Sequence, residues 1–337
     1  MRRLTVYRLE VPYREPLRVE GFEFGERQGV PTCSIVGSMR GDEVQQAYAC
    51  ARVVERLERV EERGGLRKGV RILVIPCANP LSMNVASRFW PADGTDINRR
   101  FPGDAFGETT ERVAAGIFGA VRGSTYGIQF ASFNQQGDFL PHVRVMRVGA
   151  VSEESLAMAE DFRLPCVVSR DAQPFDTGTL NYSWQEWGTH AFSVYSRTTD
   201  RIDRPSATLV GNAVMRFLGT RGLLSGHVSG GADGVRLDES ELVDVRTEGS
   251  SGYLDGRVKP GDVIEKGQEL GLVLDAFDAH VRERLVAPVA GRVFFCRVKA
   301  LVQQRMVAYR IAPLWCPGPG RSGRRLLSGE AGQKPPS

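Results

Sequence analysis

The sequence predicts a mixed α/β domain followed by a small all-β domain. Up to Gly226, helical patterns alternate with short apolar runs, and after that residue short strand-like runs are interrupted by Gly and Pro. The first pattern is typical of a sheet with helices on both faces, and the second is typical of an all-β unit. We expect the α/β domain over 1–226, the β domain over 227–313, and a disordered tail rich in Gly, Pro and Arg over 314–337.

The first elements are strands followed by a long helix. Alternating apolar and polar residues predict strands over 4–13 and 18–24, and an apolar run predicts a third over 32–36. Apolar residues near 3.6-residue spacing predict a helix over 42–63, which a pair of glycines ends. The β-branched run at 70–75 predicts a strand buried on both faces of a mostly parallel sheet.

The alternation then continues as far as residue 218. Helices are predicted over 109–121, 153–162, 180–187 and 207–218, and strands over 126–131, 166–169 and 191–195. From residue 243 onward, turn residues recur every few positions, and no helical pattern is left.

Composition excludes several classes of protein. The hydrophobic fraction of 42% and the charged fraction of 25% are those of an ordinary globular chain. A net charge of +4 over 337 residues is too small to indicate a nucleic-acid partner. No apolar run approaches the ~20 residues that cross a bilayer, and none near the start has signal-peptide length. The six cysteines lack the close spacing of a zinc knuckle or a disulfide framework. These features predict a cytoplasmic protein.

Three segments at predicted strand ends are candidates for a functional site, because open α/β sheets bind ligands there. They are residues 36–46, 79–104 and 133–145. The second segment shows neither helical nor strand periodicity, and a loop of that length in a compact domain is usually functional or disordered.

These segments resemble the succinylglutamate desuccinylase/aspartoacylase family. The resemblance rests on Asn79-Pro80, on Arg88 and on the run DINRRFPG, which begins at Asp96, and it extends over about residues 1–312. It implies a zinc-carboxypeptidase-like mixed sheet with helices on both faces and a C-terminal barrel-sandwich (lipoyl-like) domain. It also implies zinc as the family cofactor, and hydrolysis of the amide bond of N-acyl amino acids or similar small acyl compounds.

The resemblance also implies that the zinc site is degenerate. The family holds zinc with two histidines and a glutamate, which leave a fourth position for the attacking water. Arg40 stands at the first histidine position and Ala131 at the second, while Glu43 keeps the glutamate position. Tyr195 stands where the family carries its catalytic glutamate. We therefore expect that zinc is not bound.

The resemblance implies that the positions that hold the substrate are retained. Arg88, Asn98 and Arg99 match the family's substrate-binding positions, which implies a carboxylate-bearing or N-acyl amino acid-like ligand. Our hypothesis is that Arg40 forms a two-bond pair with Glu43, because an unpaired buried carboxylate costs several kcal/mol, and that Arg40 adds positive charge for the ligand. The alternative is that Arg40 points into solvent at a helix N-terminus.

Three functions stay open at this point. The first is a non-hydrolytic protein that binds a carboxylate ligand or pairs with an active paralogue, as a homo-oligomer or a hetero-oligomer. The second is an active hydrolase with a rearranged site, either a zinc site of Glu43, His142 and a further group or a metal-free site of Tyr195 and the arginines. The third is a purely structural partner. His190, Cys33 and Cys77 are interpreted as structural residues, since they lie in or beside apolar strand-like runs.

Overall fold

The computed structural model divides into two compact units, and each is described by itself. It describes residues 1–13, 15–133, 137–149, 151–226 and 228–313. The first unit is Met1–Ser240 with Phe295–Lys299, and the second is Glu241–Phe294 with the described residues from Ala300 onward. The predicted tail, 314–337, lies outside the described residues. Within the described part of the chain, no helix is long and apolar enough to cross a membrane.

A nine-stranded sheet forms the centre of the first unit, in the order β1-β2-β4-β3-β5-β9-β7-β8-β10. The strands are β1 (Arg2–Leu9), β2 (Leu17–Gly25), β3 (Cys33–Ser38), β4 (Arg71–Cys77), β5 (Tyr126–Ala131), β7 (His142–Arg147), β8 (Cys166–Asp171), β9 (His190–Tyr195) and β10 (Val235–Asp238). Strands β4, β3, β5 and β9 are parallel, whereas β7 is antiparallel to β9. The predicted mixed α/β class is thereby confirmed.

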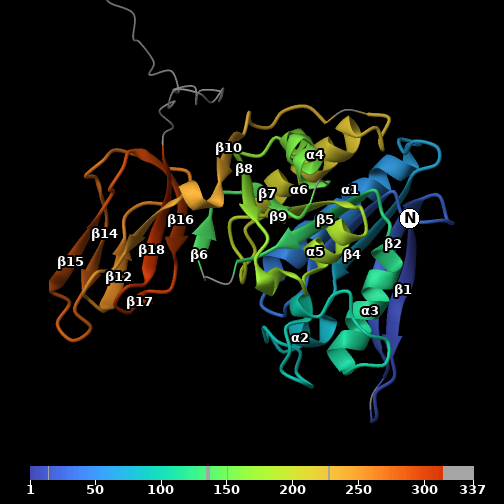
Figure 1. Cartoon of the computed structure of the whole chain (residues 1–337), viewed down its shortest axis with the longest axis horizontal. Coiled ribbons are helices and arrows are strands. Elements are labelled where there is room, and N and C mark those ends of the chain that lie inside the picture. The colour runs from blue at the N-terminus through green and yellow to red at the C-terminus, as the bar shows by residue number, and fades with distance from the viewer. Residues whose placement is uncertain (14, 134–136, 150, 227, 314–337) are drawn as a thin grey trace, which may run out of the picture. The chain divides into compact units, whose positions relative to one another are not determined.

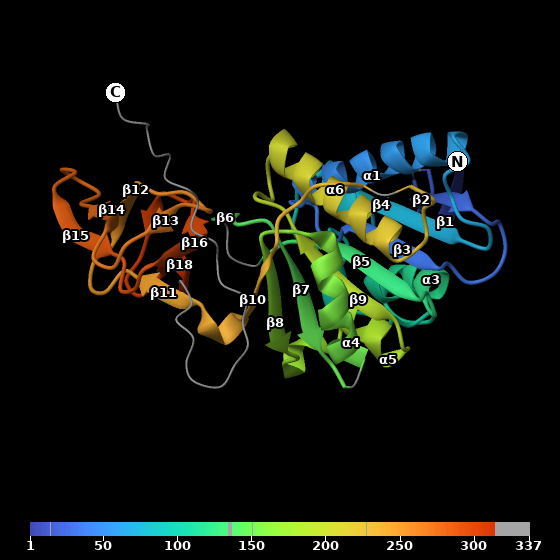
Figure 2. The ribbon, with the colours of Figure 1, turned by 90° about the horizontal axis from the view of Figure 1, so that it is seen from above.

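Helices cover both faces of this sheet (Figure 1). They are α1 (Val44–Glu62), α2 (Pro80–Asn84), α3 (Thr109–Val121), α4 (Val151–Met158), α5 (Leu180–Glu186) and α6 (Arg204–Thr220), with short 3-10 helices at Ile97–Arg99, Ala159–Phe162, Pro174–Asp176 and Glu239–Glu241. Helices α1 and α6 pack side by side on one face (Figure 2), and α3 and α5 lie on the other.

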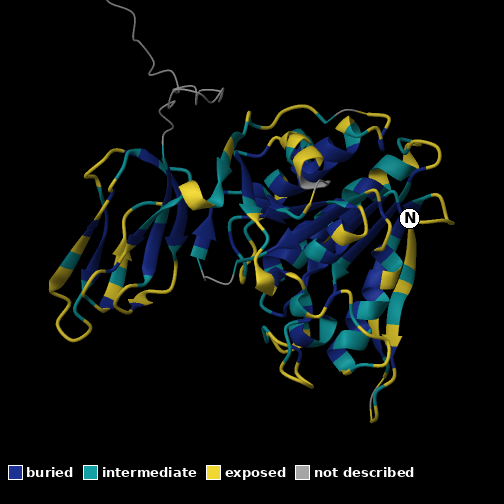
Figure 3. Cartoon of the chain, in the orientation of Figure 1, coloured by how far each residue is buried: buried dark blue, intermediate teal, exposed yellow. Residues whose placement is uncertain are grey.

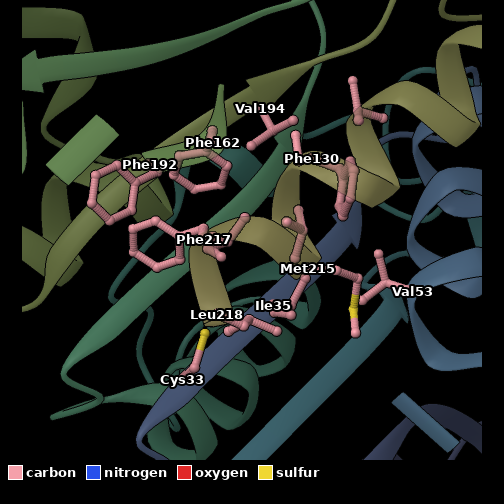
Figure 4. Packing of buried hydrophobic residues seen from close by; sticks show 14 of the residues in the cluster. Cys33, Ile35, Val53, Phe130, Phe162, Phe192, Val194, Met215, Phe217 and Leu218 are labelled. Carbon is pink, nitrogen blue, oxygen red and sulfur yellow. The ribbon is translucent and has the colours of Figure 1, made fainter. Parts of the chain in front are cut away.

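Neighbouring residues of β3 show why the sheet needs a layer of helices on each face. Ile35 belongs to the hydrophobic cluster under α1 and α6, and Val36 belongs to the cluster under α3 and α5. Figure 4 shows part of the first cluster, where Phe162, Phe192 and Phe217 pack together. Because successive side chains of a strand point to opposite faces, the continuous apolar runs read from the sequence are those of a sheet buried on both sides.

Some elements differ from the sequence prediction. Strand β7 begins inside the candidate segment 133–145, for which no strand was predicted, because Arg144 interrupts the apolar run. Strand β10 follows the predicted boundary at residue 226, but it pairs in parallel with β8 and so belongs to the first unit. The short helix α2 lies inside the segment 79–104, where Asn79 caps it by accepting the N–H of Ser82.

The second unit consists of antiparallel strands, and its interior is buried (Figure 3). The strands are β11 (Val243–Arg246), β12 (Gly252–Gly256), β13 (Val263–Ile264), β14 (Glu269–Leu274), β15 (Val281–Val286), β16 (Gly291–Arg297), β17 (Leu301–Val302) and β18 (Val307–Pro313). One sheet has the order β15-β14-β12-β17, and the second contains β11-β18-β16-β13. The end of β16 that belongs to the first unit pairs with β6 (Gly137–Phe139).

Candidate functional site

The turn between β3 and α1 is held in place by Gly41. Its N–H donates to the carbonyl oxygen of Ser87 at 3.0 Å. A Cβ atom at this position would lie 2.0 Å from the carbonyl oxygen of Ser82, so no other residue fits without moving the backbone. The turn is therefore fixed against α2, and the side chains on either side of Gly41 have defined positions.

Glu43, just before α1, accepts hydrogen bonds on both carboxylate oxygens. Its Oε2 accepts the N–H groups of Met39 at 2.7 Å and Arg40 at 3.2 Å. Its Oε1 accepts Nη1 of Arg40 at 2.9 Å and the hydroxyl of Ser132 in a short hydrogen bond. A carboxylate offers about four acceptor positions. All four are used by donors of this chain, and the residue is only 1% exposed.

Arg40 is buried between two carboxylates rather than exposed to solvent. Its Nε and Nη2 donate to Oδ2 of Asp96 at 3.0 and 2.8 Å, and the residue is 4% exposed. Burial alone would lower the pKa of Arg40, but the charges of Glu43 and Asp96 outweigh it and raise that pKa above its usual value. The group of three side chains carries a formal charge of −1.

This geometry corrects the hypothesis for Arg40 in two respects. The pair with Glu43 forms through one side-chain hydrogen bond, and the two-bond contact is made to Asp96 instead. Because two carboxylates share its charge, Arg40 does not add net positive charge for a ligand. Sequence reasoning missed Asp96 as the second partner, since it lies 56 residues away along the chain.

The positions that would hold zinc do not fit the ion. A guanidinium has no acceptor atom, so Arg40 cannot be a ligand. Ala131, at the end of β5, has no ligating atom, and the lone pairs of Glu43 are occupied. Across the residues that the structure describes, no group of three or more His, Cys, Asp and Glu side chains could hold a metal ion.

Tyr195 and His142 lie in an aromatic stack at the end of β9. Tyr195 is in register with Ala131 on one side and His142 on the other. Its ring lies 4.6 Å from that of His142 at an angle of 4°, and 4.3 Å from that of Phe133. Burial raises the pKa of the Tyr195 phenol, and the residue is 1% exposed.

His142 is neutral in this stack. Burial lowers its pKa to about 3, although Nδ1–H donates to the carbonyl oxygen of Leu140 at 2.8 Å; nearby Arg144 lowers the pKa further. Its ring is fully buried.

The other three predicted substrate-binding residues lie in different surroundings. Asn98 uses its side-chain oxygen to accept the N–H of Leu180 at 3.2 Å, which holds the start of α5. Arg99 donates to the carbonyl oxygen of Phe175 at 2.6 Å, and its side chain is 31% exposed. Arg88 lies 3.6 Å from Asp42, with a side chain that is 26% exposed. The side chains of Arg88 and Arg99 are therefore accessible to solvent, whereas the side chain of Asn98 has a structural role.

Two further arginines were not identified from the sequence. Arg170, on β8, makes two hydrogen bonds to Asp176, at 2.6 and 2.8 Å. Arg144, on β7, places its guanidinium carbon 4.7 Å from the centre of the Tyr195 ring. Glu239 lies 3.5 Å from Arg170 and 3.9 Å from Arg144. The sequence signals were that Arg144 interrupts the apolar run HVRVM and that Arg170 directly follows the run CVVS.

Comparison with known proteins finds a family profile and a curated relative that match parts of this chain. The sequence profile of the succinylglutamate desuccinylase/aspartoacylase catalytic domain matches residues 29–207. Among curated proteins, the N-alpha-acetyl-L-2,4-diaminobutyric acid deacetylase of Halomonas elongata is 32% identical over 84 residues. That match spans 25% of this chain and 23% of the relative.

Solved structures match nearly the whole chain. A succinylglutamate desuccinylase/aspartoacylase from Rhodobacter sphaeroides has a TM-score of 0.73 at 17% identity, covering 92% of this chain and 94% of that one. The product-bound ectoine utilization protein EutE (DoeB) from Ruegeria pomeroyi has a TM-score of 0.72 at 18% identity, covering 88% and 89%. An aspartoacylase family protein from Mesorhizobium loti has a TM-score of 0.71 at 22% identity, covering 93% and 91%. At these identities the likeness describes the fold alone.

Proposed function

The chain belongs to the succinylglutamate desuccinylase/aspartoacylase family, and from that premise we propose that it is a non-hydrolytic member that binds a small carboxylate ligand without zinc. The observation that carries the proposal is the saturation of Glu43. Four donors from this chain, one of them the Arg40 guanidinium, occupy the carboxylate that the family resemblance assigns to zinc. A cation already compensates its charge, so a metal ion would have to displace Arg40.

The proposed ligand is a carboxylate-bearing or N-acyl amino acid-like compound. Arg88 and Arg99 support it, because both side chains reach solvent and guanidinium groups suit carboxylates. The name of the Halomonas relative, a deacetylase of an N-acetylated amino acid, supports the same ligand class.

Metal analysis tests this proposal when combined with an activity assay. The full chain is purified without chelator, its zinc content is measured, and release of free amine is followed with N-acetyl and N-succinyl amino acids. We expect zinc far below one ion per chain and no amine release. Stoichiometric zinc together with turnover would overturn the proposal in favour of an active hydrolase with a rearranged site.

The association state, the location and the fold of the second unit complete the proposal. We expect a homo-oligomer, or a hetero-oligomer with an active paralogue, in the cytoplasm. The antiparallel strands between Val243 and Pro313 support a barrel-sandwich domain with a structural role. Co-purification with a tagged paralogue, set beside the mass of the chain alone in solution, separates the two kinds of oligomer. A monomeric mass for the chain alone, together with no co-purification with the paralogue, would exclude both kinds of oligomer.

A further inference from the structure

Positive charge gathers around a group of residues of which only Arg99 belongs to the family motif. Three arginines and two carboxylates meet there: Arg99, Arg144, Arg170, Asp176 and Glu239, which we call the arginine cluster. Its formal charge is +1, whereas Arg40 with Glu43 and Asp96 carries −1. The excess positive charge therefore lies in the arginine cluster and not at Arg40.

Within the arginine cluster, Arg144 differs from Arg170 in how it is held. Arg170 is bound through two short hydrogen bonds to Asp176. Arg144 donates no side-chain hydrogen bond within the described part of the chain, and its one ion pair there is the 3.9 Å contact with Glu239. The guanidinium of Arg144 lies instead over two aromatic rings. Its central carbon is 4.7 Å from the centre of the Tyr195 ring and 5.5 Å from that of Phe133.

This arrangement positions a guanidinium without using its donors. A cation–π contact is made through the flat face of the guanidinium, so the N–H groups at its edge stay available to an acceptor. The side chain of Arg144 is 18% exposed, which lets a dissolved molecule reach it. A planar guanidinium with two N–H groups side by side matches the two oxygens of a carboxylate.

We propose that Arg144 binds the carboxylate of the ligand, with Arg99 and Arg170 supplying further positive charge. This inference rests on the proposed function and names the residue that recognises the anionic group. Tyr195, at the position of the family's catalytic glutamate, thereby becomes a positioning residue, since its ring holds Arg144 in place.

The test compares an acid with its neutral amide. Binding of N-acetylglycine and of N-acetylglycinamide to the full chain is measured by calorimetric titration for the wild type, Arg144→Gln and Arg144→Lys. Arg236→Gln is the matched control, because its side chain is 47% exposed and pairs with Glu160 rather than with a residue of the arginine cluster. Arg88→Gln is measured in parallel.

We expect the wild type and Arg236→Gln to bind the acid more tightly than the amide. Arg144→Gln should weaken binding of the acid by at least about tenfold and leave binding of the amide unchanged. Arg144→Lys should weaken binding of the acid less than Arg144→Gln does, because lysine keeps the charge but not the planar pair of donors. If Arg144→Gln does not fold, the Arg144→Lys variant decides: an unchanged acid-to-amide ratio overturns the inference.

Failure of the inference and failure of the proposed function give different results. If Arg144→Gln keeps the preference for the acid and Arg88→Gln loses it, the carboxylate binds elsewhere and this inference alone falls. If the wild type does not distinguish the acid from the amide, both the inference and the proposed carboxylate-binding function fall.

Discussion

Arg40 and Glu43 are both nearly inaccessible to water, so each depends on the other to compensate its charge. A buried ion pair is not by itself strongly stabilising, because desolvation offsets most of the attraction. Removing one partner is costly, however, because the other charge is left buried. Arg40 serves two carboxylates, Glu43 and Asp96, so its loss leaves both without their principal cation.

We predict that Arg40→Met lowers the free energy of unfolding by about 3–5 kcal/mol. Urea unfolding at pH 7.5 measures this change. The double variant Arg40→Met/Glu43→Gln should recover part of the loss, because it removes one of the two uncompensated charges. A loss in the single variant below about 1 kcal/mol, the usual value of exposed pairs, would contradict the burial of this pair.

The burial of His142 makes the free energy of unfolding depend on pH. Burial lowers its pKa from 6.5 to about 3. The unfolded chain therefore binds a proton at this residue below pH 6.5, and the folded chain does not until about pH 3. Falling pH thus favours the unfolded state across that interval.

Comparison with His142→Phe isolates this contribution. Between pH 7.5 and pH 5.0, the wild type should lose about 2 kcal/mol more of its unfolding free energy than His142→Phe does. Denaturant unfolding at both pH values measures the difference. His280→Gln is the control, since its side chain is 84% exposed, and it should follow the wild type. Equal pH dependence of the wild type and His142→Phe would show that His142 is protonated in the folded chain.

At the scale of elements, the contact of α5 with β5 requires a glycine in β5, because there is no room for a side chain. Gly127 is the second residue of β5 and lies against the ring of Trp184, and a Cβ atom there would lie 2.6 Å from that ring. Trp184 is fully buried, and its indole N–H donates to the carbonyl oxygen of Val121 at 3.3 Å. The ring therefore has little freedom to move away.

Gly127→Ala should destabilise the chain by about 1–3 kcal/mol through overpacking and should change the fluorescence of Trp184. The matched control is Gly119→Ala on α3, where an added Cβ meets no atom within 4 Å. That substitution should instead stabilise the chain by about 0.5–1 kcal/mol through helix propensity. Thermal unfolding of the two variants measures both changes, and the same sign for both would contradict this account.

Elements with clear periodicity could be predicted from the sequence, and those that depend on a distant partner could not. Helix α1 begins within two residues of its predicted start, because its apolar spacing is a local property. Strand β10 has four residues and no pattern of its own, and it forms only because β8 offers an edge for pairing. The helix predicted over 153–162 divides into α4 and a 3-10 turn.

The same distinction applies to the candidate site. The family motif located Arg40, Glu43 and Arg99, since those residues lie in recognisable segments. Arg144 and Arg170 lie within strands, and their meeting with Asp176 and Glu239 depends on the pairing of β7, β8 and β10. Contacts between residues far apart in the chain require the sheet order, which the sequence pattern did not provide.

At the scale of the whole molecule, the family fold forms here with a pair of charged side chains in the region where the resemblance places zinc. An ion that binds only the folded state would raise stability by about 2.7 kcal/mol at 100 times its dissociation constant. We predict that zinc does not raise the stability of this chain, because the positions of Arg40 and Ala131 offer no ligand atoms.

Thermal unfolding with excess zinc and with chelator should therefore give the same midpoint. The double variant Arg40→His/Ala131→His is the comparison, since it restores both histidine positions of the family and should gain a zinc-dependent rise. A wild-type midpoint that falls on adding chelator would show that a metal ion contributes to the folded state.

The contact between Arg40 and Asp96 has a consequence for how this sequence can change over time. A single substitution of Arg40 by histidine would leave the Asp96 and Glu43 carboxylates without the guanidinium that now separates them. A change toward a metal-binding sequence that begins at Arg40 thus passes through a less stable chain. We therefore expect that a zinc site can form in this chain only when the positions of Arg40 and Ala131 are both replaced by histidine.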